Sequence, residues 1–183
     1  MAEIEFQIGQ IFEDTYPPEA ACWCNAHGDR YITEIDPTED GKRRFQIVAV
    51  PAPSVDDVRQ QKLQELDQKF MRWYEQDATV TSSLGFVADS DARAMMDVSG
   101  LVTTLEATPA ETRSTVAFMD AENQPHALTL EQMKTVQLEI IQNGQSAYAQ
   151  KWALRTAIES AETTEAVNAI EIEFHGEDFS AAS

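Results

Sequence analysis

Two cysteines and a histidine lie close together near the start of the chain, in the stretch CWCNAH. Cys22 and Cys24 are separated by one residue, and His27 follows three positions after the second thiol. Thiolates and imidazoles are the ligands of structural zinc, which usually takes four of them in two closely spaced pairs. The remaining histidines, His126 and His175, come from distant segments, so the second pair of ligands is missing. We therefore expect no metal site here.

The same thiols also lack the spacing of a redox centre. Thioredoxin-like sites carry two residues between their cysteines, whereas Cys22 and Cys24 have only Trp23 between them. In a strand over residues 21–25, side chains two positions apart share one face, so both thiols would lie opposite Trp23. We interpret the stretch as a packed strand in a reducing compartment.

No other catalytic constellation stands out. The sequence has no glycine-rich phosphate loop, no G-x-S-x-G and no H-E-x-x-H. Asp89-Ser90-Asp91 resembles the start of a calcium loop, but Gly100 stands where such a loop has its last glutamate. These carboxylates suit a helix N-terminus instead. We predict no catalytic residue, no metal and no cofactor. The alternative is a small enzyme that uses carboxylates, which would need a pocket with two carboxylates of divergent pKa.

Charge is the strongest compositional signal. The 183 residues contain 13 Lys and Arg against 32 Asp and Glu, a formal net charge of −19 that is spread along the chain. A surface that binds DNA or RNA needs clustered basic residues, so we expect no nucleic-acid partner. The acidity favours solubility. A second interpretation is an acidic mimic of nucleic acid that inhibits a host DNA- or RNA-binding protein.

Nothing in the sequence indicates a membrane or secreted protein. No run approaches the roughly 18 apolar residues that a membrane span needs. The opening MAEIEFQIGQ is acidic, whereas a secretion signal begins with basic residues. We expect no membrane partner.

The first 50 residues predict a small antiparallel β-meander. Alternating apolar side chains and turn residues predict short strands, over residues 3–12, 21–25, 30–35 and 44–50. Pro51 and Pro53 then make residues 51–53 a stiff linker.

Residues 54–173 predict a mainly helical domain with one hairpin, and residues 174–183 an acidic tail. Ser54 with Asp57, and Thr129 with Gln132, are helix-capping pairs. Apolar residues at spacings of three and four follow each of them. The expected elements are helices from 54, over 90–105, from 130 and near 165–172, and a hairpin of residues 115–119 and 125–128. Asn143-Gly144 predicts a break in the helix that starts at Leu130.

Four aromatic residues are candidate anchors for a partner protein. Trp23 and Tyr31 lie in the predicted meander, and Trp73 and Tyr74 at the end of the first long helix. Large aromatic side chains contribute much of the binding energy at protein interfaces. Helical aromatics at this spacing also commonly belong to the core.

The chain resembles phage and prophage tail-fibre accessory and tail-assembly proteins. The N-terminal residues that carry the resemblance are YPPEAA at 16–21, WCN at 23–25, YI at 31–32, EI at 34–35, RRFQIV at 43–48 and the prolines Pro51 and Pro53. Residues 66–172 resemble a domain of unknown function that recurs in phage tail genes. The residues that carry this second resemblance are Gly85-Phe86, Asp89, Asp91, Ala92, Gly100, 116–120, Asn123, 128–130 and YAQKWAL at 148–154.

We therefore expect an α+β protein with an N-terminal antiparallel β-meander (1–50) and a mainly helical domain with one β-hairpin (54–173). The resemblance implies a non-enzymatic tail accessory protein, either a tail-fibre assembly chaperone or a minor tail component. Its partner would be a phage tail or tail-fibre protein. It would act in the cytoplasm of the host bacterium during assembly, and a tail component would also be present in the virion.

Overall fold

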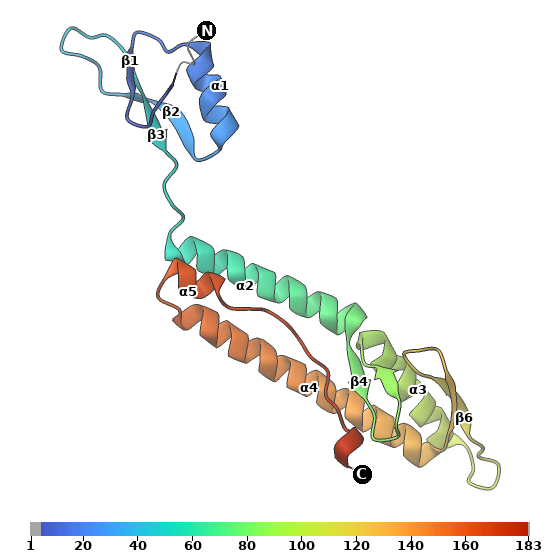
Figure 1. Cartoon of the computed structure of the whole chain (residues 1–183). Coiled ribbons are helices and arrows are strands. Elements are labelled where there is room, and N and C mark those ends of the chain that lie inside the picture. The colour runs from blue at the N-terminus through green and yellow to red at the C-terminus, as the bar shows by residue number, and fades with distance from the viewer. Residues whose placement is uncertain (1–4, 183) are drawn as a thin grey trace. The chain divides into compact units, whose positions relative to one another are not determined.

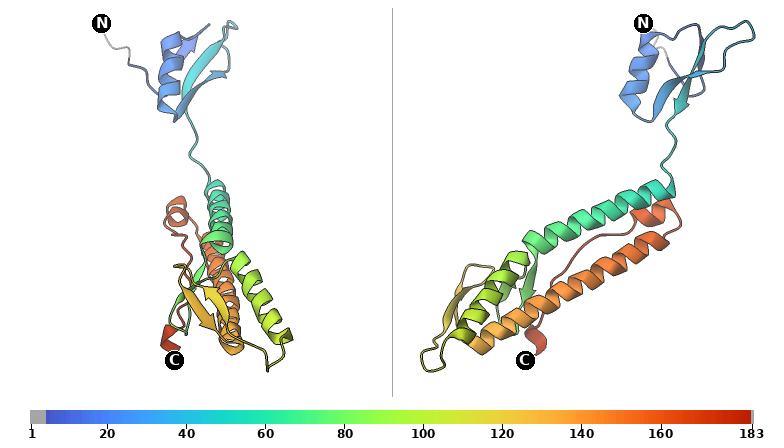
Figure 2. Two further views of the ribbon diagram at one scale, coloured as in Figure 1. Left: turned by 90° about the vertical axis from the view of Figure 1, so that its right-hand side faces the viewer. Right: turned by 180° about the vertical axis from the view of Figure 1, so that it is seen from behind.

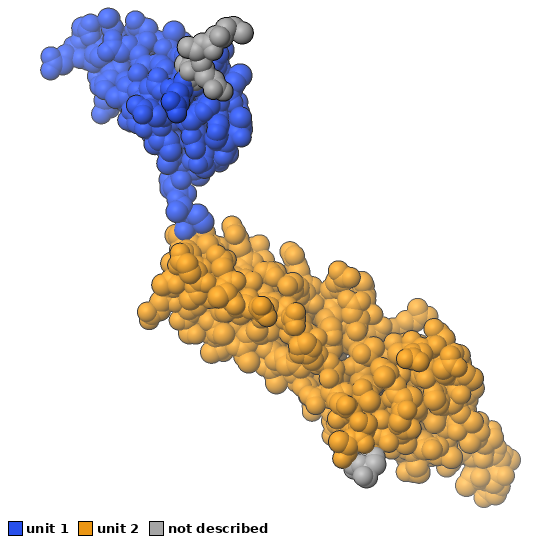
Figure 3. All heavy atoms as spheres, in the orientation of Figure 1, with its two compact units in different colours: residues 1–53 blue, residues 54–183 orange. Residues whose placement is uncertain are grey.

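The computed structural model describes residues 5–182. The chain divides into two compact units, residues 1–53 and 54–183, so the boundary falls at the end of the proline segment (Figure 3). The predicted α+β class is confirmed: antiparallel strands come first, and a mainly helical part with small hairpins follows (Figure 1). None of the described helices is both long and apolar enough to cross a membrane.

The N-terminal unit is a three-stranded antiparallel sheet with one helix on it. The strands are β1 (Ile11–Glu13), β2 (Arg30–Ile35) and β3 (Arg44–Ala49), in the order β1-β3-β2. Helix α1 (Pro18–His27) connects β1 to β2 and packs on one face. The small core between them is formed by Phe6, Ala20, Cys24 and Ile47, with Phe12, Trp23 and Ile32 at its margin.

The strand predicted over residues 21–25 is wrong, because this segment is the middle of α1. Pro17 has an extended backbone at the N-cap, and Pro18 takes the first helical position, where a missing N–H is harmless. Gly28 ends the helix in the left-handed conformation and donates its N–H to the Cys24 carbonyl at 3.3 Å. The two prolines therefore mark the start of a helix.

The predicted meander is also wrong in its connections, since β1 pairs with β3 and a helix separates β1 from β2. The strand predicted over residues 3–12 is replaced by the shorter β1, and Ile4 lies outside the described residues. Gly9, with a φ of 90°, turns the chain just before β1. Its N–H donates to the Ile47 carbonyl at 2.7 Å, which keeps this turn beside β3.

Four helices and two hairpins make up the second unit. The helices are α2 (Val55–Arg72), α3 (Ala92–Ala107), α4 (Leu130–Ser160) and the short α5 (Thr164–Asn168). A π-helical turn, Trp73–Asp77, continues α2. The hairpins are β4 (Thr79–Thr81) with β5 (Val87–Asp89), and β6 (Val116–Met119) with β7 (Pro125–Leu128). A final 3-10 turn spans Ser180–Ala182.

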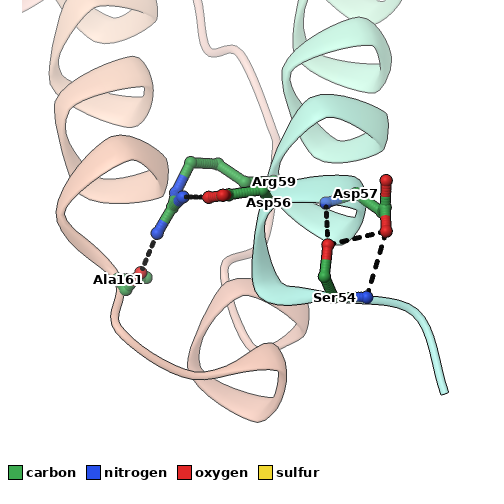
Figure 4. A network of polar contacts seen from close by, with 5 residues as sticks. All are labelled: Ser54, Asp56, Asp57, Arg59 and Ala161. Carbon is green, nitrogen blue, oxygen red and sulfur yellow. Dashed lines mark hydrogen bonds and ion pairs between the residues drawn. The ribbon is translucent and has the colours of Figure 1, made fainter.

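Local capping fixes where the two long helices begin. The Ser54 hydroxyl accepts the Asp57 N–H at 3.1 Å, while the Asp57 carboxylate accepts the Ser54 N–H at 3.1 Å (Figure 4). Thr129 and Gln132 form the same reciprocal pair at the start of α4. In the same view Arg59 donates to the Ala161 carbonyl at 2.8 Å, which joins the start of α2 to the end of α4 (Figure 4).

The predicted break at Asn143-Gly144 is wrong, because α4 is continuous over 31 residues. Glycine in a helix costs about 1 kcal/mol relative to alanine. Here the loss is offset by Asn143, which is fully buried and hydrogen-bonded to three separate segments. The tertiary contacts of Asn143 therefore hold together a helix that its own sequence would interrupt.

Helix α4 spans two hydrophobic cores. One core packs its N-terminal half against α3 and both hairpins, and includes Met133, Val136 and Ile140. The other packs its C-terminal half against α2 and α5, and includes Ala147 and Ile158. Figure 2 shows α2 alongside one half of α4 and α3 alongside the other. The helix is therefore the axis around which the unit is built.

Candidate functional site

The four predicted aromatic anchors do not form one site. Trp23 is half-buried at the margin of the N-terminal core, with its ring 6.0 Å from that of Phe6. The Arg30 guanidinium lies 4.3 Å from the centre of the Trp23 ring, a cation–π contact. Trp23 lies in α1, whereas Tyr31 lies in β2 and is 45% exposed. In the N-terminal unit, Tyr31 is thus the more accessible of the two.

Trp73 and Tyr74 are half-buried in the second unit. Tyr74 stacks on Phe70, with ring centres 5.6 Å apart and an interplanar angle of 20°. Trp73 lies 6.0 Å from Phe174. Both rings pack on the core formed by α2, α4 and the C-terminal segment, and Trp73 also lines a 300 Å³ groove with Lys69 and others. Each therefore contributes an edge to the surface and the rest of its ring to the core.

The most exposed apolar side chains of α4 form a row that the sequence analysis missed. We call this row the α4 stripe; it consists of Leu138, Ile141, Tyr148 and Trp152. Leu138 is 54% exposed and Trp152 is 58% exposed, although such side chains favour burial. The spacings of three, seven and four residues place all of them on one side of the helix.

The missed signal was the angle around the helix. In the sequence, Tyr148 and Trp152 belong to the same series of apolar residues after Thr129 as Ile140 and Ile158. At about 100° per residue, Trp152 lies roughly 120° round the helix from Ile158, which is fully buried. Helix α4 therefore carries two separate apolar rows, one buried and one exposed. The exposed row cannot be recognised when the two are counted as one.

Basic side chains and buried rings surround the Trp152 end of the stripe. Tyr148 lies 5.0 Å from Phe70, so the stripe is continuous with the buried aromatic cluster. The Arg155 guanidinium lies 5.7 Å from the centre of the Trp152 ring. Lys151 pairs with Asp67 at 2.8 Å. The aromatic surface thus has a polar rim, which is the usual anatomy of a protein interface.

A row of polar side chains on α4 faces the β4–β5 hairpin and the C-terminal segment. It consists of Glu139, Asn143, Ser146 and Gln150, at spacings of four, three and four. The buried Glu139 carboxylate accepts the Ser82 hydroxyl at 2.6 Å and the Ser83 N–H at 3.0 Å. Gln150 exchanges two hydrogen bonds with the backbone of His175, at 3.0 and 3.1 Å. These contacts hold the β4–β5 hairpin and the final segment on the helix.

A cleft of 420 Å³ lies between α3 and β6. Apolar side chains such as Val98, Leu101 and Phe118 line it, together with Asp89, Asp91 and Asp97 and one basic residue, Arg93. Burial and the neighbouring carboxylates of Asp91 and Asp120 raise the pKa of Asp89. Within residues 5–182, no three His, Cys, Asp or Glu side chains are grouped so that they could hold a metal ion.

Asp120, close to the cleft, has its pKa lowered, first by the His126 imidazole, which lies 2.8 Å from its Oδ2. Its other oxygen accepts the backbone N–H groups of Glu122 and Gln124, at 2.9 and 2.7 Å. Both carboxylate oxygens therefore hold the β6–β7 turn. Asp89 and Asp120 do have shifted pKa values of opposite sign, but Asp120 does not line the cleft.

The thiols at the start of the chain do not share a face, contrary to the prediction. In α1, residues two apart point about 200° apart, so Cys22 is exposed while Cys24 is buried. Burial raises the pKa of the Cys24 thiol. The His27 Nδ1 lies 2.7 Å from the Trp23 carbonyl oxygen. The three side chains thus have separate local roles in α1.

Comparison with known proteins identifies the second unit. The family described as "Domain of unknown function (DUF4376)" matches residues 57–172, which run from the first turn of α2 to the segment beyond α5. The chain belongs to this family. No curated protein and no solved structure matches the chain. The α4 stripe, the polar row and the α3–β6 cleft all lie within the DUF4376 match, whereas Trp23 and Tyr31 lie outside it.

Proposed function

We propose that the chain is a non-enzymatic binding protein that serves as an accessory of a phage-type tail. It buries the α4 stripe in a groove of a tail or tail-fibre protein, and works in the cytoplasm of the host bacterium. The observation that carries the proposal is the exposure of Leu138 and Trp152 on a helix whose opposite side is buried. An amphipathic helix that lays an apolar row into a groove is a recurring mode of protein recognition.

The tail assignment rests on the resemblance of residues 16–53 and 66–172 to tail accessory proteins. Two roles are consistent with it. An assembly chaperone would cover an apolar surface of a fibre protein until that protein trimerises or docks. A minor tail component would keep the same contact in the particle.

The experiment is photocrosslinking in cells that produce the phage. The photoreactive amino acid p-benzoylphenylalanine replaces Trp152 in the full chain, and the matched control carries it at Ala153. Ala153 is also exposed but is turned about 100° away on α4. We expect Trp152 to yield a crosslink to a tail or fibre protein and Ala153 to yield none. Presence of the chain in purified particles identifies a tail component, and presence with free fibre alone identifies a chaperone.

Binding to the captured protein is then measured with purified components. We expect Leu138→Ser with Trp152→Ser to weaken binding by at least about 30-fold, or about 2 kcal/mol. Gln142→Ser with Ala153→Ser, on the neighbouring exposed side of α4, should change it less than about threefold. Equal effects of the two double variants on binding contradict the proposal. So does a sedimentation experiment in which the chain dimerises through the α4 stripe.

Salt separates this proposal from an acidic mimic of nucleic acid. Apolar anchors depend little on salt, so binding should change by less than about tenfold between about 0.1 and 0.5 M. A mimic binds a basic groove through charge, and its affinity would fall by orders of magnitude over the same range.

A further inference from the structure

Backbone hydrogen bonds link the C-terminal segment to β4 and the β6–β7 turn to β5. On one side of β4, Thr81 donates its N–H to the Glu177 carbonyl at 3.0 Å and accepts the Phe179 N–H at 2.8 Å. On the other side β4 pairs with β5, antiparallel. On the far side of β5, the Ala121 N–H of the β6–β7 turn donates to the Val87 carbonyl at 2.9 Å. The two hairpins are thus separate two-stranded sheets that this bond joins at one point.

The open edge of β6 can be identified from its pairing with β7. Asp120 donates its N–H to the Gln124 carbonyl at 3.0 Å, so this is a hydrogen-bonded pair of the antiparallel ladder. Alternation then makes Ala117–Ala127 a pair without hydrogen bonds, and likewise Met119 with Pro125. The N–H and C=O groups of Ala117 and Met119 therefore point away from β7, and no described group pairs with them.

The α3–β6 cleft lies at this open edge. Ala117 and Met119, with their unpaired backbone, line the cleft together with Asp89. The apolar side chains of α3, Val98 and Leu101 among them, also line the cleft. The cleft thus combines an unpaired strand edge with an apolar lining, the two features that a binding strand uses.

The charges around the cleft favour a basic ligand. Asp91 caps α3 by accepting the Ala94 N–H at 2.7 Å, and Asp97 pairs with Arg93 at 3.8 Å. Asp89 forms no ion pair with any basic group among residues 5–182. Burial first, and then the neighbouring carboxylates of Asp91 and Asp120, raise the pKa of its carboxyl group. A lysine or arginine beside Asp89 would compensate this unbalanced negative charge.

We propose that the α3–β6 cleft receives an extended, basic segment of a partner protein, which adds as a strand to the open edge of β6. The backbone of the segment bonds to Ala117 and Met119. Alternate side chains contact the apolar lining, and a lysine or arginine lies beside Asp89. This surface is distinct from the α4 stripe and does not depend on the function proposed for it.

The test uses the full chain and synthetic peptides. The probe is an acetylated, amidated peptide of alternating lysine and valine, eight residues long (~25 Å when extended). One control peptide has glutamate in place of lysine, and another carries N-methyl groups throughout, which keeps the side chains and removes every backbone donor. We expect measurable binding of the lysine peptide by calorimetry, and binding at least about tenfold weaker for both controls.

Two matched protein variants locate the strand. Ala117→Pro removes an N–H that faces the cleft, and Ala127→Pro removes the N–H of its cross-strand partner, which faces the opposite edge. We expect Ala117→Pro to abolish peptide binding and Ala127→Pro to leave it within about twofold. Asp89→Asn should weaken it at least about fivefold.

The proposal is overturned if both proline variants bind equally, if the N-methylated peptide binds as well as its parent, or if no peptide binds. The second outcome would indicate capture by charge alone. Should Ala117→Pro fail to fold, as judged by circular dichroism, the comparison of the parent and N-methylated peptides on the unmodified chain decides the question.

Discussion

Asn143 and Glu177 are 34 residues apart in the sequence, yet the Glu177 N–H donates to the Asn143 Oδ1 at 2.8 Å. The Asn143 amide also donates to the Ser90 hydroxyl at 2.8 Å and to the Thr79 carbonyl at 3.2 Å. One buried side chain of α4 therefore joins β4, the start of the α3 segment and the C-terminal segment. This contact is one of several that bind the residues beyond Ile172 to the body of the unit, with those from Thr81 and Gln150.

Replacing Asn143 should therefore destabilise the whole second unit. In Asn143→Ala, the part-buried Glu177 N–H and the Thr79 carbonyl lose their Asn143 partner, and an unsatisfied buried group costs about 1–3 kcal/mol. We expect the free energy of unfolding in urea to fall by about 3 kcal/mol or more. Gln142→Ala, at the exposed neighbouring position, should change it by less than about 0.5 kcal/mol. An equal and small effect of both would show that Asn143 is not a hub.

Two glycines near this hub should respond in opposite directions to alanine. A Cβ on Gly144 would lie 3.8 Å from the Tyr74 ring, an ordinary contact, and alanine is favoured in a helix by about 1 kcal/mol. A Cβ on Gly176 would overlap the Thr79 carbonyl oxygen. We expect Gly144→Ala to raise the midpoint of thermal unfolding and Gly176→Ala to lower it. A rise for both would mean that the C-terminal segment does not lie against β4.

The accessible thiol provides a test of α1. Cys22 is exposed, whereas Cys24 is 3% exposed and its pKa is raised by burial. A thiol-specific reagent at neutral pH should therefore modify one cysteine per chain rapidly, and the second only when the chain unfolds. Cys22→Ser should remove the fast phase and Cys24→Ser should leave it. Two fast thiols would favour the strand that the sequence predicted.

The sequence predicted the features that depend on local chemistry and missed those that depend on distant contacts. The starts of α2 and α4 follow from capping pairs within four residues, Ser54 with Asp57 and Thr129 with Gln132. The β6–β7 hairpin follows from its turn residues. By contrast, β4 and β5 have three residues each, too few for alternation to be recognised.

The candidate site was missed for a related reason. Trp73 is predicted at the end of the long helix and begins the π-helical turn that continues it, but the sequence does not show that Phe174 lies beside its ring. Likewise, whether Trp152 faces α2 or solvent depends on which side of α4 the other helices occupy. The signal for the covered side of α4 was its row of polar residues at 139, 143, 146 and 150. Such a row within an apolar helix marks the side where other segments form hydrogen bonds with it.

The second unit should fold without the first. Its two cores contain residues from position 58 onward, and the family match begins at residue 57. The prolines 51 and 53 lie at the boundary between the two compact units, as is typical of the linkers between domains. We expect residues 54–183 alone to be soluble and to show a helical circular dichroism spectrum with cooperative thermal unfolding. Aggregation of this fragment, when the full chain is monomeric, would show that residues 1–53 complete its core.

Asp120 and Asp89 should give opposite dependences of stability on pH. The pKa of Asp120 is lowered in the folded chain, first by His126, so its stabilisation is complete above its unfolded pKa of about 3.9 and is lost as pH falls through the lower folded value. The pKa of Asp89 is raised by burial and by Asp91. Its charged form therefore destabilises the fold above that raised pKa, and the penalty disappears in acid.

Thermal unfolding of two matched variants between about pH 2.5 and 7 tests both signs. At neutral pH we expect Asp120→Asn to unfold at a lower temperature than the unmodified chain, and Asp89→Asn at a higher one. Both differences should shrink as the pH falls through about 4, because the carboxyl groups that the variants replace then become neutral as well. If both variants shift the unfolding temperature in the same direction, the surroundings assigned to one of the two carboxylates are wrong. If a difference in unfolding temperature does not change with pH, the charge of the carboxylate is not its cause.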